Sequence, residues 1–140
     1  MANLASINRQ LGRIAREVLK LEVERKRLME KPVPLLPSSQ EERELEKKFL
    51  EAHRKWTRIL KLMKKKEQLV RKNVRLGDWV LVDGMEHHGW FRVIGFYDYN
   101  DYIHELERPN EYMWGIVGKA EDGTVIKFTF RSVNGIRRGW

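Results

Sequence analysis

The sequence predicts an α+β protein, in which an antiparallel helical (coiled-coil) hairpin over residues 1–73 precedes a small aromatic-rich β-barrel over residues 74–140. Apolar residues recur every three or four positions in the first segment and alternate in the second. Residues 1–73 hold 20 Lys/Arg against 10 Asp/Glu, whereas residues 74–140 hold 8 against 10. Only 2 of the 14 aromatic residues precede residue 74. The two segments therefore follow different structural principles and are interpreted as two domains.

The first helix is predicted from apolar residues at heptad spacing, which only Arg25 interrupts. These apolar residues are Leu4, Ile7, Leu11, Ile14, Val18, Leu21 and Leu28. The second helix has the same spacing, interrupted by Lys66, at Leu45, Phe49, Ala52, Trp56, Ile59, Met63 and Val70. Between the two, Pro32, Pro34 and Pro37 forbid helix. Ser39 with Glu42 three residues later predicts a capping box at the second start.

Two complementary heptads joined by a short proline-rich turn most simply fold back on each other. A parallel intermolecular coiled coil is the structural alternative, because further apolar residues widen the stripe: Leu19, Val23, Leu50, Leu60, Leu62 and Leu69. A wide stripe has to be buried against the barrel, a second hairpin or a partner.

Basic residues are concentrated on the predicted helices, and the spacing of those on the first helix places them on one face. We expect them to contact nucleic-acid phosphates: Arg9, Arg13, Arg16, Lys20, Arg54, Lys55, Arg58, Lys61, Lys64, Lys65, Arg71 and Lys72. The alternative interpretation is a solvated coiled-coil flank that keeps the protein soluble. An acidic protein surface would be attracted equally well.

Beyond Val74 the pattern predicts short strands. Residues 76–84, 89–97, 111–119 and 124–131 form the strands, with a polar loop over residues 98–110. Asp122-Gly123 predicts a hairpin turn. In the fourth strand, Ile126, Phe128 and Phe130 should face one side, opposite Val125, Lys127, Thr129 and Arg131. A helical turn over residues 132–136 and a last short strand ending at Trp140 complete the expected domain.

Four or five short strands with one long loop are typical of a small closed or half-open barrel of the SH3-like or Tudor-like class. Gly77-Asp78-Trp79-Val80 followed by His88-Gly89 and Gly95 is similar to the pattern that opens RNA-polymerase-interacting Tudor-like domains of bacterial transcription factors. The resemblance covers about 20 residues and implies a polymerase-binding barrel. We keep that implication as an alternative, and the sequence assigns the chain to no family.

The second segment has more aromatic residues than a small core needs, so part of them should be exposed and bind a partner. The candidates are Trp90, Tyr97, Tyr99, Tyr102, Tyr112 and Trp114, with Trp140 at the end of the chain. The alternative is that these rings cover the barrel mouth or pack on the hairpin.

Catalytic, metal and cofactor sites are not expected. The chain has no cysteine, no Walker-type loop and no nucleophile-elbow motif. His87, His88, His104 and Glu105 lack the paired spacing of a metal site. No apolar run suits a bilayer span or a secretory signal, so we expect a soluble, cytoplasmic protein that is not an enzyme.

Three functions remain open at this point. The first is a nucleic-acid-binding accessory protein that contacts DNA or RNA through its basic hairpin. The second is an adaptor or inhibitor of a nucleic-acid machine, such as a polymerase or nuclease, that binds protein through the barrel aromatics. The third is an assembly protein whose hairpin self-associates through the wide apolar stripe, giving a homo-oligomer.

Overall fold

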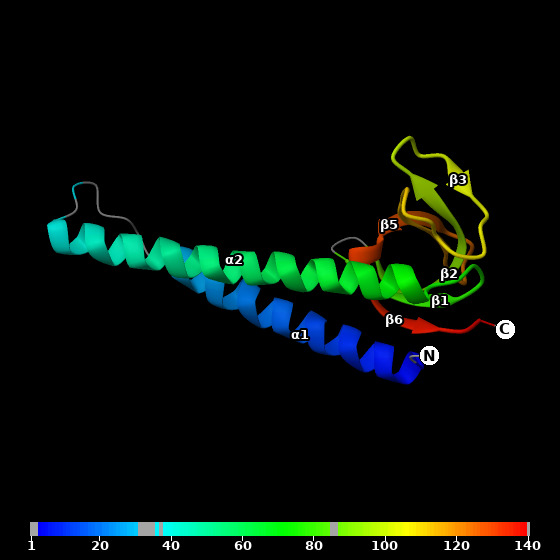
Figure 1. Ribbon diagram of the computed structural model, residues 1–140, viewed down its shortest axis with the longest axis horizontal. Helices are drawn as coiled ribbons and strands as arrows, with labels where there is room; N and C mark the ends of the chain where they lie inside the picture. Colours follow the sequence, from blue (N-terminus) through cyan, green and yellow to red (C-terminus); the bar gives the residue numbers. More distant parts are fainter. Residues whose placement is uncertain (1–2, 31–35, 37, 85–86, 140) are drawn as a thin grey trace. The chain divides into compact units, whose positions relative to one another are not determined.

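The computed structural model describes residues 3–30, 36, 38–84 and 87–139. Two long helices, α1 (Leu4–Met29) and α2 (Ser39–Asn73), pack antiparallel and precede a six-stranded antiparallel sheet (Figure 1). The predicted α+β class and the order of helices and strands are therefore confirmed. The predicted proline turn lies outside the described residues.

The chain forms two compact units whose limits fall inside both helices. One contains Met1–Arg13 and Lys64–Trp140, and we call it the sheet unit; the other, Ile14–Met63, is the hairpin unit. Residue 73 marks the change from helix to strand. That residues 1–73 and 74–140 are separate domains stays a prediction.

In the hairpin unit, the two helices meet through a narrow apolar seam formed by Ile14, Leu21, Ala52 and Ile59, all of them buried. Ion pairs flank this seam: Arg58 Nη2 lies 2.7 Å from Glu17 Oε1, and Lys55 Nζ lies 2.8 Å from Glu24 Oε2. The residue number rises along α1 from Glu17 to Glu24 while that of the partner on α2 falls from Arg58 to Lys55, as expected for antiparallel helices. At the polar interruption, the Arg25 guanidinium stacks 4.9 Å from the Trp56 ring centroid.

The start of α2 differs from the prediction by one residue. Glu41 N donates to Ser38 Oγ (3.2 Å), and Ser38 N donates to Glu41 Oε1 (3.4 Å). The capping box is thus Ser38–Glu41, and the predicted box at Ser39 and Glu42 is wrong. Two consecutive serines are each followed three residues later by a glutamate, so the sequence pattern alone does not separate the two registers.

The sheet contains β1 (Trp79–Asp83), β2 (His88–Asp98), β3 (Ile103–His104), β4 (Met113–Lys119), β5 (Val125–Thr129) and β6 (Val133–Arg137). The strand order is β5-β4-β2-β1-β6, and β3 pairs with the end of β2. β3 lies inside the segment predicted as a loop. The helical turn covers Phe130–Ser132, so the turn predicted at 132–136 is wrong and a strand occupies most of that range.

The core of the sheet unit combines strands with the helix ends that belong to it. Ile7 and Leu11 of α1 and Val70 of α2 are buried in one cluster with Phe96 and Phe130 of the sheet. The predicted alternation in β5 is confirmed, because Phe128 is buried while Val125, Lys127 and Thr129 are exposed. The sheet therefore shares its hydrophobic core with the first turns of α1 and the last turns of α2.

Two polar contacts attach the end of the chain to the rest of the sheet unit. The Asn8 side chain donates to Ile136 O (2.9 Å) and accepts from Ile136 N (2.8 Å), which satisfies backbone groups of the edge strand β6. Arg138 donates to the buried Asp78 carboxylate and to Asn73 O. Burial raises the pKa of Asp78, against the hydrogen bonds from Arg75 N and Arg138 that favour its charged form.

Candidate functional site

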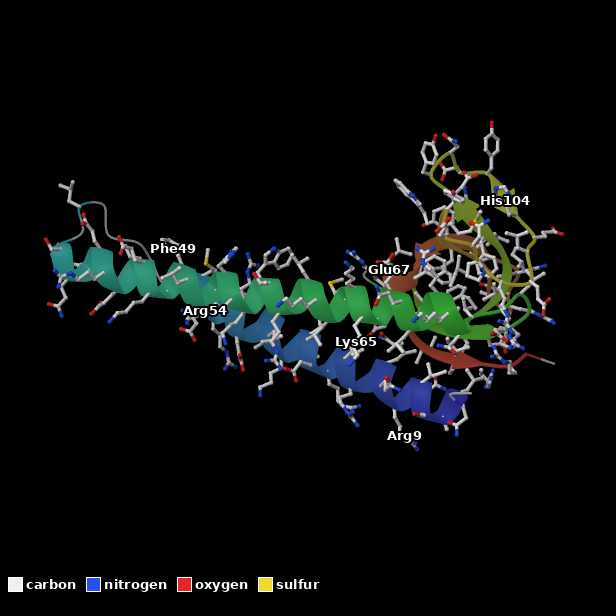
Figure 2. The ribbon with its side chains drawn as sticks, viewed as in Figure 1. Arg9, Phe49, Arg54, Lys65, Glu67 and His104 are labelled. Atoms are coloured by element: carbon white, nitrogen blue, oxygen red, sulfur yellow. The ribbon has the colours of Figure 1, made fainter. Side chains whose placement is uncertain are left out.

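The basic residues of the sheet unit's helical parts are largely free of ion pairs. Arg9, Arg13, Lys64, Lys65 and Lys72 are exposed, and the described part of the chain brings no carboxylate within 4.0 Å of them. Figure 2 labels Arg9 on α1 and Lys65 on α2. Their positions follow from the heptads, because residues opposite a buried seam point to solvent. These five cations are available for an external anion.

In the hairpin unit, the residues predicted to contact phosphates divide into two groups. Arg16, Lys20, Arg54 and Lys61 are exposed, again with no carboxylate within 4.0 Å among the described residues. Lys55 and Arg58 instead hold Glu24 and Glu17 of the neighbouring helix. The hydrogen bond from Lys55 lowers the pKa of Glu24 and raises the pKa of Lys55.

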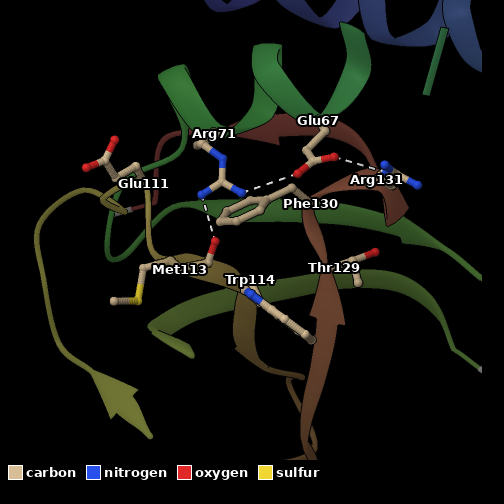
Figure 3. A pocket seen from close by; sticks show the side chains of 8 residues that line it. All are labelled: Glu67, Arg71, Glu111, Met113, Trp114, Thr129, Phe130 and Arg131. Carbon is tan, nitrogen blue, oxygen red and sulfur yellow. Dashed lines mark hydrogen bonds and ion pairs between the residues drawn. The ribbon is translucent and has the colours of Figure 1, made fainter. Parts of the chain in front are cut away.

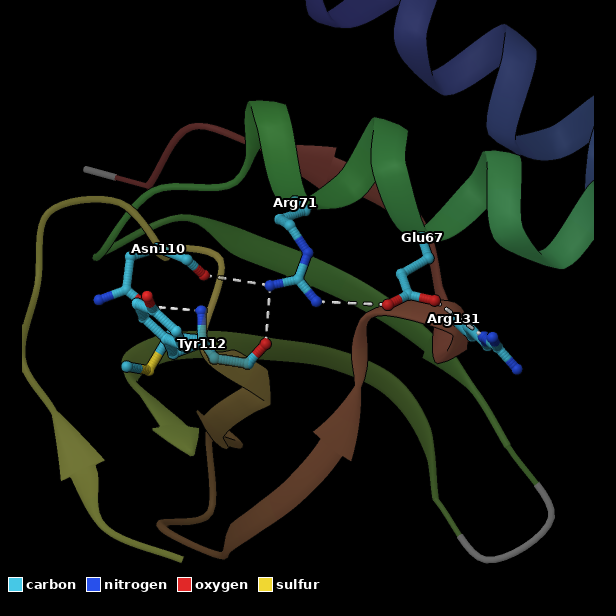
Figure 4. A network of polar contacts seen from close by, with 6 residues as sticks. Glu67, Arg71, Asn110, Tyr112 and Arg131 are labelled. Carbon is cyan, nitrogen blue, oxygen red and sulfur yellow. Dashed lines mark hydrogen bonds and ion pairs between the residues drawn. The ribbon is translucent and has the colours of Figure 1, made fainter. Parts of the chain in front are cut away.

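Arg71, which the sequence places among the nucleic-acid contacts, makes its hydrogen bonds inside the sheet unit. Its Nη1 donates to Met113 O (2.7 Å) and Asn110 O (3.1 Å), and its Nη2 donates to Glu67 (3.3 Å) (Figure 4). Its guanidinium also lies 4.4 Å from the Phe130 ring centroid. With these contacts made, Arg71 is a structural residue that holds the start of β4 against α2.

Lys66 is buried within the sheet unit, only 8% exposed, where it donates a hydrogen bond to Asn134 Oδ1. Burial lowers its pKa to about 8, and the distant Asp83 charge opposes that shift. The sequence shows Lys66 only as an interruption of the seam. The structure shows that Lys66 is buried in the sheet unit together with its ammonium group.

Four of the predicted partner-binding aromatics in the sheet unit are more than half exposed. Tyr99, Tyr102, Tyr112 and Trp114 are 68%, 68%, 71% and 62% exposed, and the rings of Tyr99 and Trp114 are 6.1 Å apart between centroids. Exposure at this level is unusual for rings of this size and favours a binding role. Tyr97, in contrast, is buried, and burial raises the pKa of its hydroxyl.

The two remaining aromatic candidates do not join this group. Trp90 is 37% exposed, and the Arg137 guanidinium stacks 4.7 Å from its ring centroid. Trp140 lies outside the described residues.

The loop that carries Tyr99 and Tyr102 is organised by one carboxylate. Asp98 accepts hydrogen bonds from Asn100 N (2.9 Å), Tyr102 N (3.2 Å) and His104 Nε2 (2.9 Å). The His104 contact is the main reason why the pKa of Asp98 is lowered. Asp101 adopts a left-handed backbone conformation at φ 64°. An aspartate bonded to the backbone two residues later is a turn signal that the sequence contains and that our interpretation missed.

A groove of about 490 Å³ adjoins the exposed aromatics in the sheet unit (Figure 3). Trp114 and Glu111 form one part of its lining, and Phe130 and Arg131 another. The Glu67 carboxylate within it is already bonded to Arg71 and, at 3.0 Å, to Arg131. The groove is therefore lined by the exposed Trp114 ring and by a Glu67 carboxylate whose charge is already matched by two arginines.

Within the described residues, no group of three or more His, Cys, Asp or Glu side chains is arranged to hold a metal ion. His88 contacts Asp83 at 2.8 Å, as His104 contacts Asp98. No helix in the described part of the chain is long and apolar enough to cross a bilayer.

Comparison of the chain with protein-family models, with curated proteins and with solved structures finds no match.

Proposed function

We propose that this protein is a non-enzymatic nucleic-acid-binding protein that contacts the phosphate backbone through the exposed basic residues of α1 and α2. One observation supports the proposal above the others. Of the twelve cations predicted to contact phosphates, nine are exposed and have no carboxylate within 4.0 Å among the described residues: Arg9, Arg13, Arg16, Lys20, Arg54, Lys61, Lys64, Lys65 and Lys72.

Unpaired cations on helices favour a polyanion because each phosphate contact releases a condensed counterion. Lys55, Arg58 and Arg71 contribute less in this proposal, since their charges are already matched inside the protein. Contacts to the phosphate backbone carry no base-sequence information directly. The proposed binding is therefore steeply salt-dependent and weakly dependent on sequence.

For the sheet, the finer proposal is a small barrel of the SH3-like or Tudor-like class. The order β6-β1-β2-β4-β5, with a helical turn between β5 and β6, supports this proposal. Irregular pairing in β1 and β2, at Leu81/Val82, Val93/Gly95 and Tyr97/Asp98, supplies bends of the kind that closure needs. The barrel would place the basic helices beside a compact scaffold and is not needed for the binding chemistry.

The test is a titration of labelled mixed-sequence DNA and RNA with the full-length protein across a salt series. We expect the logarithm of the binding constant to fall linearly with the logarithm of salt, by about 0.9 per phosphate contact on duplex DNA. Replacing Lys61, Lys64 and Lys65 with glutamate is expected to abolish binding at physiological salt, because three attractive contacts become repulsive.

The matched control replaces Lys26, Arg43 and Lys47 with glutamate and so changes the net charge equally. These three exposed cations lie within residues 22–51, where 7 Lys/Arg are balanced by 8 Asp/Glu. Binding by this control should remain near that of the unmodified protein. Loss in both variants would show that only net charge matters. Absence of binding at low salt would refute the proposed function.

A further inference from the structure

The sheet unit carries a surface whose charge is opposite to that of the helices. We call it the acidic aromatic patch and define it by the rings of Tyr99, Tyr102, Tyr112 and Trp114 and the carboxylates of Asp101, Glu105, Glu107 and Glu111. Residues 98–114 contain five Asp/Glu and one Lys/Arg, a formal charge of −4. A phosphate backbone is repelled by such a surface, so the patch needs a different ligand from the helices.

The patch is held in place before any ligand arrives. Asp98 fixes the backbone of Asn100 and Tyr102, and β3 pairs with β2 just beyond them. On the other side, Arg71 holds the carbonyls of Asn110 and Met113, the residues that bracket Tyr112 and precede Trp114 (Figure 4). Because these segments are already ordered, little conformational entropy is lost when the rings bind a partner.

The patch also contains a cation-binding arrangement that the chain itself uses. Lys127 Nζ lies 3.5 Å from Asp101 Oδ1 and 5.7 Å from the centroid of the Tyr97 ring. A ring beside a carboxylate therefore already holds one ammonium group at the edge of the patch. Glu105, Glu107 and Glu111 are exposed, and no Lys, Arg or His lies within 4.0 Å of them in the part of the chain described. Their charges are available to an external cation.

We propose that the acidic aromatic patch binds an arginine-containing segment of a partner protein. The guanidinium stacks on the Tyr99–Trp114 pair, and its N–H groups donate to the neighbouring carboxylates. Arginine suits the site better than lysine because its planar group stacks on a ring and hydrogen-bonds at its edges together. Within the described residues a guanidinium lies over an aromatic ring at Arg25–Trp56, Arg71–Phe130 and Arg137–Trp90, and Arg71 also donates to the Glu67 carboxylate.

The groove extends the patch, since Trp114 and Glu111 line both (Figure 3). Its volume of about 490 Å³ accommodates a side chain next to the bound arginine. The Glu67 charge there is matched by Arg71 and Arg131, so the neighbouring side chain should be apolar and pack against Trp114. The partner is therefore an extended segment in which arginine adjoins an apolar residue.

The test measures fluorescence anisotropy of labelled peptides titrated with the full-length protein. The probes are three peptides of equal length that alternate leucine-glycine with arginine, lysine or glutamate. We expect the arginine peptide to bind most tightly and the glutamate peptide not to bind. Replacing both Tyr99 and Trp114 with alanine should weaken the arginine peptide roughly tenfold or more, as loss of central aromatic anchors does.

Two matched controls keep the result specific. Trp56→Ala removes an exposed tryptophan of the hairpin unit, and Glu121→Gln removes an exposed carboxylate outside the patch; both should bind the arginine peptide as the unmodified protein does. A triple variant with glutamine in place of Glu105, Glu107 and Glu111 should bind the arginine peptide more weakly. The proposal is overturned if the arginine peptide does not bind, or if the Tyr99/Trp114 double variant binds it equally well.

The same variants separate this inference from the nucleic-acid proposal. The Tyr99/Trp114 double variant should bind DNA unchanged, whereas the Lys61/Lys64/Lys65 variant should bind the arginine peptide unchanged. Each proposal can thus fail while the other holds.

Discussion

At the scale of single residues, the two interruptions of the apolar seams behave differently. The Arg25 guanidinium lies over the Trp56 ring, although its Nε is buried with no hydrogen-bond acceptor among the described residues. Lys66 is more deeply buried and has Asn134 as its hydrogen-bond acceptor. Because burial of an ammonium group disfavours its charged form, Lys66 should destabilise the folded protein at neutral pH.

Replacing Lys66 with methionine is therefore expected to stabilise the protein at pH 7 by roughly 2 kcal/mol, allowing for the lost hydrogen bond to Asn134. The folded-state pKa of Lys66 is about 8, below its ordinary value of 10.5. Between these values the unfolded chain binds more protons, so the free energy of unfolding of the unmodified protein rises with pH. The advantage of the methionine variant should be complete below pH 8 and disappear toward pH 10.5.

Urea denaturation of both proteins at pH 7, 9 and 10.5 checks this prediction. Tyr97, whose raised pKa also lies in the alkaline range, titrates in both proteins and largely cancels in the difference. A stability difference that stays constant over this range would contradict the assignment.

At the scale of elements, the sheet depends on close approach at a glycine of β4. A Cβ atom added to Gly115 would overlap the Phe128 carbonyl oxygen and lie 2.6 Å from the Tyr97 hydroxyl oxygen. Tyr97 is buried over this position, and β4 pairs there with both β2 and β5. The absence of a side chain thus allows the Tyr97 ring to pack against β4, next to the exposed Trp114.

Gly115→Ala should accordingly lower the free energy of unfolding by about 1 to 3 kcal/mol, the usual effect of overpacking. Gly135→Ala in β6 is the matched control, because its nearest contact is an ordinary 3.5 Å to Leu81 Cβ. That variant should change stability by less than about 1 kcal/mol. Chemical denaturation of the two variants measures the difference, and equal losses would show that the overlap at Gly115 is relieved at no cost.

At the scale of the whole molecule, the helices and the sheet are not independent in the sheet unit. Ile7, Leu11 and Val70 are almost fully buried in the cluster that contains Phe96 and Phe130. Fully burying such a side chain contributes about 1.5 to 3 kcal/mol, so three contribute roughly 5 to 9 kcal/mol. That amount is comparable with the whole stability of a small domain.

A fragment of residues 74–140 is therefore expected to lack a cooperative unfolding transition, and mixing it with a fragment of residues 1–73 should restore folding. Thermal unfolding followed by circular dichroism, with and without the second fragment, checks this. Cooperative unfolding of the isolated 74–140 fragment would instead support the two-domain division predicted from the sequence.

Features that depend on neighbours along the chain could be predicted from the amino-acid sequence. Heptad spacing predicted both helices, alternation predicted the inward Phe128 and Phe130, and the charge count predicted basic helices. Local periodicity was sufficient in each case because the side-chain direction repeats with the backbone. It was insufficient where neighbouring registers were equivalent, as at Ser38 and Ser39.

Which charges are paired within the protein and which aromatic rings are exposed depends on tertiary contacts. Asn8 meets Ile136, and Glu67 meets Arg131, across 128 and 64 residues of chain. The Arg71 guanidinium donates to the Met113 carbonyl, although the sequence places Arg71 among the nucleic-acid contacts. Tyr97, predicted among the exposed rings, is buried over Gly115. The physical reason is that burial and ion pairing depend on segments far apart in the sequence, which become neighbours only when the chain has folded.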